Sequence, residues 1–360
     1  MHTRIAGVGS YVPHHRITNT SIYRAIPDPT GRWSPESIQR LFALETRAFL
    51  WPLDEERGCT VRPREGEPAT GVDMGALALR DALAHANVDA AQLDLLIVVT
   101  GTADQPDFCF EAVSLHKRIG MRRDAQAFTI NSGCGGTPYV MHTCKQLMAS
   151  GMRNIAVVAW NLHSPLLKRE VHALFVEPEP GKKLGAFMSA YLFGDAASAI
   201  ILQRSETPGI VASMSGTDYK ELVLRRGGGV ASMPYHEGVS LVDYVYTVAG
   251  HDVADEYPER MKDCFTDVFG QRPELRSQVA RYYLHQPNRN SLFRFTRGAG
   301  IPDERVACNV HRIGNTSAAG TLLLLAEDIA RGTVCLGSGT PICIAAIGAN
   351  EHYGAQLILL

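Results

Sequence analysis

A long-period internal repeat limits the folds open to this chain more than any other feature of its sequence. In the first copy, an apolar run leads into a Gly-rich polar turn that holds Cys134, and a helical pattern ends at Gly151, 17 residues later (151 − 134). In the second copy, the polar turn holds Asn315, and Gly332 again lies 17 residues later (332 − 315). Repetition of such a unit predicts two similar halves. A pseudo-twofold axis between them would bring the two helix starts together at the centre of the molecule.

The strand and helix patterns of the first half are those of an α/β protein. A helical pattern from 72 to 86 precedes the apolar run 95–100, and a second apolar run, 127–130, precedes the turn that holds Cys134. A helix is predicted from there to about Ser150, followed by a strand at 155–160. Alternation of this kind is typical of buried parallel sheets covered by helices.

The second half repeats this order. It contains a predicted helix at 253–269, a strand at 282–285, a strand at 305–310, a helix that ends at Arg331, and an apolar stretch at 333–348. We therefore divide the chain into an N-terminal half, 1–205, that carries Cys134 and a C-terminal half, 206–360, that carries His285 and Asn315.

Composition excludes several classes of function. A formal net charge of -2 leaves no broad basic face for nucleic acid, and no stretch approaches the roughly 18 uncharged apolar residues of a membrane span. The chain does not start with the apolar core of a secretory signal. The eight cysteines are scattered without C-x-x-C pairs, so they are expected to be free thiols and no metal site is predicted. A cytoplasmic protein that binds small molecules or other proteins is the expectation.

Cys134 is the strongest candidate for a nucleophile. It lies at the predicted start of a helix, where unpaired amides and the macrodipole favour an anion and where the pKa of a thiol falls. The Cys134 amide can itself donate a hydrogen bond to an oxyanion. A buried structural cysteine that follows a strand explains the same local sequence.

His285 and Asn315 are ambiguous when each is taken alone. His285 ends an apolar strand, where open α/β sheets place their ligands, but a structural histidine also fits there. Asn315 lies in a Gly-Asn-Thr-Ser turn, where an asparagine can simply cap a helix.

Together with Cys134, the segments His-Gln-Pro-Asn at 285–288 and Gly-Asn-Thr-Ser-Ala-Ala at 314–319 form a specific combination. The chain resembles the 3-oxoacyl-[acyl-carrier-protein] synthase III family of the thiolase superfamily, and the resemblance spans nearly the whole sequence. Further matching segments are 5–13, 192–199 and 226–234. The resemblance implies a five-layer α/β/α/β/α thiolase-like fold, a homodimer, and a catalytic triad of Cys134, His285 and Asn315.

The resemblance also implies the chemistry. An acyl group passes from coenzyme A (CoA) or an acyl carrier protein to Cys134 and then condenses with a malonyl-type thioester, in fatty-acid-like or polyketide-type metabolism. No permanently bound cofactor is implied, because the thioesters are substrates. The family's Gly-rich oxyanion loop corresponds here to 348–351, so the Ala349 amide is the expected second oxyanion donor beside Cys134.

Two alternatives to condensation stay open. The first is an acyltransferase that passes the Cys134-bound acyl group to a hydroxyl or amine with His285 as general base, and the second is a non-catalytic partner subunit of a condensing heterodimer. Segment 32–49 departs from the family's CoA-binding segment, and 162–187 is longer than its counterpart, so donor and chain length stay open. The remaining candidates are secondary. Glu111 could act as a base, although a solvated residue at a helix start is the favoured interpretation, and Asp195 is interpreted as a structural turn residue. The basic residues Lys182, Lys183, Arg225 and Arg226 could contact an acidic carrier protein or a phosphate.

Overall fold

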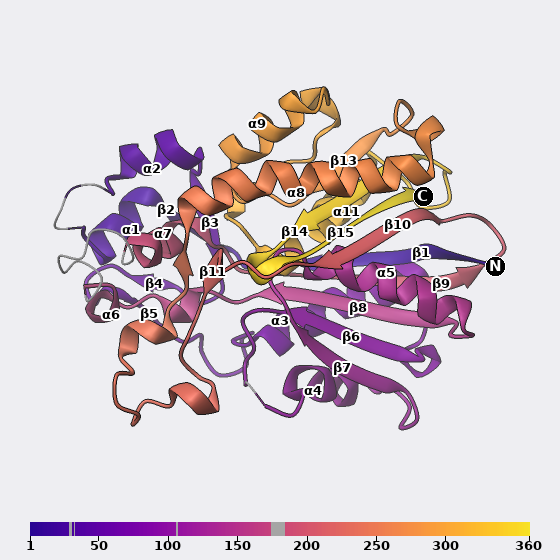
Figure 1. Cartoon of the computed structure of the whole chain (residues 1–360). Coiled ribbons are helices and arrows are strands. Elements are labelled where there is room, and N and C mark those ends of the chain that lie inside the picture. Colours follow the sequence, from indigo (N-terminus) through magenta and orange to yellow (C-terminus); the bar gives the residue numbers. More distant parts are fainter. Residues whose placement is uncertain (29–30, 32, 106, 174–183) are drawn as a thin grey trace.

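The computed structural model describes residues 1–28, 31, 33–105, 107–173 and 184–360. It contains two mixed β-sheets, each built from one half of the chain, with helices on both sides of each sheet (Figure 1).

The first sheet has the strand order β1-β9-β8-β6-β7. Strand β6 runs parallel to its two neighbours, β7 and β8, whereas β9 is antiparallel to β8 and to β1. Every residue of β6 is buried, which explains its continuous apolar sequence. These strands are β1 (His2–Tyr11), β6 (Leu95–Thr100), β7 (Gln126–Asn131), β8 (Asn154–Asn161) and β9 (Ala196–Ser205).

The second sheet repeats this arrangement with four strands in the order β10-β15-β14-β13. Strand β13 is parallel to β14, and β15 is antiparallel to β14 and to β10. These strands are β10 (Ile210–Thr217), β13 (Arg281–Leu284), β14 (Pro341–Ile347) and β15 (His352–Leu359).

The strand predicted at 305–310 is wrong, although the structure describes all of these residues. They contribute one isolated bridge, between Val306 and Tyr282, in the position that β7 occupies in the first sheet. The physical reason is that a side chain binds backbone amides that a strand would need for pairing. The Gln286 Oε1 accepts hydrogen bonds from the amides of Asn309 and Val310, both at 3.1 Å, so these amides are not available to a neighbouring strand.

The principal helices complete five layers. Helices α3 and α4 cover the outer face of the first sheet, α8 packs on the outer face of the second sheet with α9 beside it, and α5 and α11 lie between the sheets (Figure 1). The fold is therefore the predicted thiolase-like α/β/α/β/α sandwich of two duplicated halves. These helices are α3 (Gly71–Ala86), α4 (Phe110–Ile119), α5 (Gly136–Ala149), α8 (Gly250–Gln271), α9 (Arg289–Gly298) and α11 (Gly320–Ala330).

Smaller elements gather at one end of the molecule, on the left of Figure 1. Their buried residues form a separate apolar cluster that includes Ile22, Phe49 and Tyr191. Four of these elements contribute side chains to the cavities beside Cys134, through residues such as Phe42, Leu192, Val223 and Val248. They are β2 (His15–Thr18), α1 (Asn19–Ala25), α2 (Pro35–Phe42), β3 (Thr46–Phe49), β4 (Leu53–Asp54), β5 (Cys59–Thr60), α6 (Arg169–Ala173), α7 (Leu184–Leu192), β11 (Val223–Leu224), β12 (Thr247–Val248) and α10 (Val310–Ile313).

The two middle helices start beside each other, as the repeat predicts. The Thr137 hydroxyl at the start of α5 donates to the carbonyl oxygen of Ala318, just before α11, at 2.6 Å. This contact places the turn that holds Cys134 against the turn that holds Asn315.

Candidate active site

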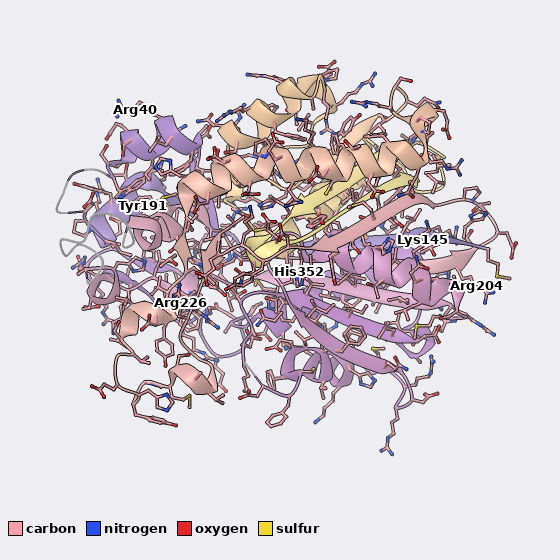
Figure 2. The ribbon with its side chains drawn as sticks, viewed as in Figure 1. Arg40, Lys145, Tyr191, Arg204, Arg226 and His352 are labelled. Atoms are coloured by element: carbon pink, nitrogen blue, oxygen red, sulfur yellow. The ribbon has the colours of Figure 1, made fainter. Side chains whose placement is uncertain are left out.

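Cys134 lies in the turn between β7 and α5 and is 8% exposed. The turn is tightly packed against the start of β15. A Cβ atom on Gly135 would lie 1.7 Å from the carbonyl oxygen of His352, so only glycine allows the two backbones to approach this closely. Figure 2 shows His352 near the centre of the molecule.

The expectation of a lowered pKa for Cys134 is wrong. Burial raises the pKa of the thiol, because a thiolate loses hydration in this environment. Hydrogen bonding between the sulfur and the side chains of Ser317 and Asn315 acts in the opposite direction and lowers the pKa, but it does not outweigh burial. The sulfur therefore rests as a thiol whose neighbours are arranged to stabilise negative charge.

Asn315 is held so that its amide group has a fixed direction. Its Oδ1 accepts a hydrogen bond from the Ser317 amide at 2.9 Å, which leaves the Nδ2 group free to face the sulfur of Cys134. Its backbone is fixed at both ends, since its amide donates to Leu192 at 2.8 Å and its carbonyl accepts from Gly194 at 3.0 Å. The segment 192–194 thus positions Asn315.

Ser317 is a site residue that the sequence analysis missed. The Cys134 Sγ donates to the Ser317 Oγ at 3.5 Å, and Ser317 has a left-handed backbone with φ of 49°. A left-handed backbone is uncommon for a residue other than glycine. The sequence feature that could have indicated Ser317 is its position two residues after Asn315 in the Gly-Asn-Thr-Ser motif.

His285 follows β13 and is 7% exposed. Burial lowers the pKa of its imidazole to about 3, so the ring is neutral at ordinary pH. The Tyr257 hydroxyl donates to the carbonyl oxygen of His285 at 2.7 Å, and the His285 amide donates to Ala345 at 2.9 Å. A neutral imidazole in this position can donate one N–H to a substrate carbonyl.

Cys134 lies between two cavities. The smaller, of about 360 Å³, is lined by both His285 and Asn315 and extends past Phe42 and Arg294. The larger, of about 630 Å³, extends past His163, Arg225 and Tyr246 and is not lined by His285 or Asn315. Cys134 and Ala349 line both cavities. The sulfur thus faces two separate spaces, and the two polar partners face one of them.

The loop that carries Ala349 can supply oxyanion donors. Among the described residues, neither the Cys134 amide nor the Ala349 amide donates to a backbone oxygen. The next two residues, Asn350 and Glu351, have left-handed backbones with φ of 53° and 43°. Glycine adopts this conformation without strain, so the loop keeps the shape of a Gly-rich loop with other side chains. Buried Glu351 lies 3.5 Å from Arg260.

The secondary candidates are not part of this arrangement. Asp195 is buried and accepts hydrogen bonds from the amides of Leu50, His163 and Ser164, and burial raises its pKa to about 6, so its role is structural. Glu111 is 2% exposed and accepts from the Gln105 amide at 3.1 Å, so the expectation of a solvated residue is wrong. It lines neither cavity.

The basic candidates fall into two groups. Arg225 and Arg226 line the larger cavity, and Figure 2 shows Arg226 on the side of the molecule that carries β5. Lys182 and Lys183 lie outside the described residues, as does the rest of 174–183 within the segment 162–187. Within the described part of the chain, no three side chains are grouped to hold a metal ion, and no helix is long and apolar enough to cross a bilayer.

Comparison with known proteins identifies the family. The model for the 3-oxoacyl-[acyl-carrier-protein] synthase III family matches residues 128–219, and the model for the C-terminal part of that family matches residues 274–360. Cys134 falls in the first match, and His285 and Asn315 fall in the second. The chain is a synthase III-like member of the thiolase superfamily.

Relatives of this synthase III-like chain match it along its full length. It is 28% identical to β-ketoacyl-[acyl-carrier-protein] synthase III of Alkalilimnicola ehrlichii, over 99% of each chain. Among solved structures, it resembles the synthase III of Pseudomonas aeruginosa, with a TM-score of 0.78, 21% identity and coverage of 100% and 98%. It also resembles OleA of Xanthomonas campestris, with a TM-score of 0.80, 17% identity and coverage of 100% and 97%. The protein is a ketoacyl synthase III-type acyltransferase.

Proposed function

We propose that the protein accepts an acyl group on Cys134 from a CoA or carrier-protein thioester and condenses it with a malonyl-type thioester. The observation that carries this proposal is the position of Cys134 between two cavities, with His285 and Asn315 lining only the smaller one. One cavity can hold the bound acyl group while the other holds the second thioester beside two hydrogen-bond donors.

The first step is thioester exchange. The Cys134 sulfur attacks the carbonyl carbon of the donor, the carbon–sulfur bond to the donor thiol breaks, and the proton of Cys134 ends on that departing thiol. The amides of Cys134 and Ala349 stabilise the tetrahedral oxyanion. The acyl chain then extends into the larger cavity, because the smaller one must receive the next substrate.

The second step is decarboxylative condensation. The carbonyl oxygen of the malonyl thioester accepts hydrogen bonds from His285 and Asn315, which stabilise the enolate formed when carbon dioxide leaves. The enolate carbon attacks the acyl carbonyl and the bond to Cys134 breaks, so the sulfur leaves as a thiolate and takes a proton from water to restore the thiol. His285 suits this role because burial keeps it neutral, with a pKa of about 3. Asn315 suits it because Ser317 fixes its amide.

The variant Asn315→Ala separates this function from simple acyl transfer. We expect Cys134 to load at a near wild-type rate, while release of labelled carbon dioxide from malonyl thioester falls by about 100- to 1000-fold, the usual effect of losing one oxyanion donor. Intact mass and trapped label measure the two steps. A wild type that loads Cys134 but acylates an alcohol or amine without releasing carbon dioxide would replace condensation by the acyltransferase function. A wild type that never loads would indicate a non-catalytic subunit.

We also propose that the protein is a cytoplasmic homodimer of two halves, 1–205 and 206–360. Strand β7 pairs with β6 and leaves its other edge without a partner among the described strands, and unpaired edges are usually covered. Nearby, Phe108 is 96% exposed and has a left-handed backbone with φ of 57°. A second copy of the chain would cover both features.

A further inference from the structure

The larger cavity beyond Cys134 carries polar and charged groups that a hydrocarbon acyl chain does not need. We propose that it binds an acyl group whose far end is a carboxylate, which Arg225 and His163 recognise. This inference rests on the proposed function, because it assumes that the acyl group carried by Cys134 occupies this cavity.

Arg225 supplies a cation without a partner. It is half-buried and lines the cavity, and within the described residues it forms no ion pair and no hydrogen bond through its side chain. The adjacent Arg226 differs, since it is exposed and pairs with Glu221 at 3.2 Å. A half-buried charge is costly unless an opposite charge meets it. An anionic ligand would provide that charge.

Tyr246 holds the guanidinium in place. The Arg225 Cζ lies 5.5 Å from the centroid of the Tyr246 ring, and the Tyr246 hydroxyl donates to the carbonyl oxygen of Gly101. An arginine stacked on an aromatic ring keeps its N–H groups available at the edge of the guanidinium plane. A carboxylate is the group that pairs with such an edge in a bidentate manner.

His163 supplies a second recognition group. It is 1% exposed, lines the same cavity, and its Nε2 has no hydrogen-bond partner among the described residues. Its ring is packed between Phe193, at 4.9 Å between centroids, and Tyr246, at 6.1 Å. Burial, together with smaller effects of His172 and Arg225, lowers the pKa of His163 to about 3, so the ring is neutral. A buried ring nitrogen left without a partner is costly, and a methyl-ended chain would leave it so.

The remaining charge in the cavity does not satisfy Arg225. Asp107 also lines the cavity, but it is exposed and forms no ion pair with Arg225. The apolar side chains of Phe193 and Val223 line both cavities, as Cys134 does. The cavity therefore offers an apolar start for the methylene groups and a polar region for a charged end.

Matched donors test the proposal on the full-length protein. Butyryl-CoA and succinyl-CoA both carry four-carbon acyl groups and differ in their far end, a methyl group or a carboxylate, and 4-hydroxybutyryl-CoA adds a neutral polar end. We expect intact-mass kinetics to show that succinyl loads Cys134 at least about tenfold faster than butyryl, because hydrogen bonds to charged groups are the stronger ones. Glutaryl-CoA and pentanoyl-CoA repeat the comparison with one more carbon.

Substitutions locate the preference. We expect Arg225→Leu to remove it while butyryl still loads, which also shows that the variant is folded. Arg225→Lys should restore part of the preference, and His163→Leu should reduce it. The matched control is Arg276→Leu, which removes another arginine stacked on an aromatic ring, with its Cζ 5.8 Å from the Phe269 centroid. Arg276 lines neither cavity, so the variant should keep the wild-type preference.

Several results would overturn the proposal. One is a wild type that loads butyryl or 4-hydroxybutyryl at least as fast as succinyl, and another is a preference that survives Arg225→Leu. In either case loading itself occurs, so the proposed acylation of Cys134 stands while the carboxylate recognition falls. If none of the donors loads Cys134, the proposed function falls together with this inference.

Discussion

At the scale of single residues, the site depends on groups whose charge is set by burial. Burial raises the pKa of Cys134 and lowers the pKa of His285 to about 3, so both groups rest uncharged. The sequence analysis identified both residues, but it predicted a lowered pKa for Cys134. A helix start favours a thiolate, whereas the loss of hydration that outweighs it depends on the packing around the sulfur and is not encoded locally.

The reactivity of Cys134 should depend steeply on pH. Since the thiolate is the reacting form and the pKa is raised, we expect the rate of iodoacetamide alkylation at Cys134 to rise about tenfold per pH unit between about pH 6 and 8, without a plateau. Peptide mass mapping distinguishes Cys134 from the other thiols. A Ser317→Ala variant should react about tenfold more slowly at a given pH, because a hydrogen bond that favours the thiolate is lost. If the alkylation rate instead reached a plateau below pH 7, the pKa of Cys134 would be lowered, as the helix start alone predicts.

At the scale of elements, the start of α5 and the end of β14 determine the geometry of the site. Both Gly135 and Gly348 lie where the two segments approach closely, and a Cβ on Gly348 would lie 2.5 Å from the Gly135 amide nitrogen. This contact holds the Cys134 amide beside the Ala349 amide. The two proposed oxyanion donors therefore come from elements that are distant in the sequence.

The variant Gly135→Ala should disrupt that contact. Its Cβ would overlap the His352 carbonyl, so we expect the free energy of unfolding to fall by about 1–3 kcal/mol, as in other overpacked sites. Loading of Cys134 should slow by about 100-fold, because a displacement of about 1 Å has that effect. Denaturant unfolding and intact mass measure the two effects. The control Gly270→Ala, in α8 with open space around it, should be neutral or stabilising by up to about 1 kcal/mol. Unchanged loading in Gly135→Ala would contradict this role.

The elements themselves were largely predictable. The apolar runs at 95–100 and 155–160 became strands because continuous apolar segments of that length fit a sheet covered on both faces, and the run at 127–130 became the edge strand beside them. The segment 305–310 has the same local pattern, but Gln286 binds its amides from another part of the chain. Ser317 and His163 could not be predicted for a similar reason. A left-handed backbone and an unpaired ring nitrogen become visible only when the surrounding residues are in place.

At the scale of the whole molecule, the first sheet has one incompletely covered edge. Strand β7 is half-exposed along most of its length, whereas β6 beside it is fully buried. The loop that holds Phe108 leads into α4, which packs against β7 and exposes Val113. These features lie on one side of the first sheet and fit a single interface with a second copy.

A charge at Phe108 should weaken that interface. A buried phenylalanine contributes about 1.5–3 kcal/mol, and a twofold dimer buries it twice, so Phe108→Asp should raise the dimer dissociation constant by at least about 100-fold. Light scattering across a dilution series measures this. The control Tyr219→Asp changes another exposed aromatic residue, which is 74% exposed, and should leave the mass unchanged. A wild-type mass of one chain at all concentrations would rule out the homodimer.

The position of His285 and Asn315 on the smaller cavity alone has a consequence for the order of events. In the proposed function the acyl chain occupies the larger cavity, so the acyl donor and the malonyl thioester both approach Cys134 from the smaller one and cannot occupy the protein together. The first thiol has to depart before the second substrate enters, which is a double-displacement scheme. Excess of either thioester would then block the form of the protein that awaits the other, and the ratio of the two pools, rather than the abundance of one, would set the flux through the enzyme.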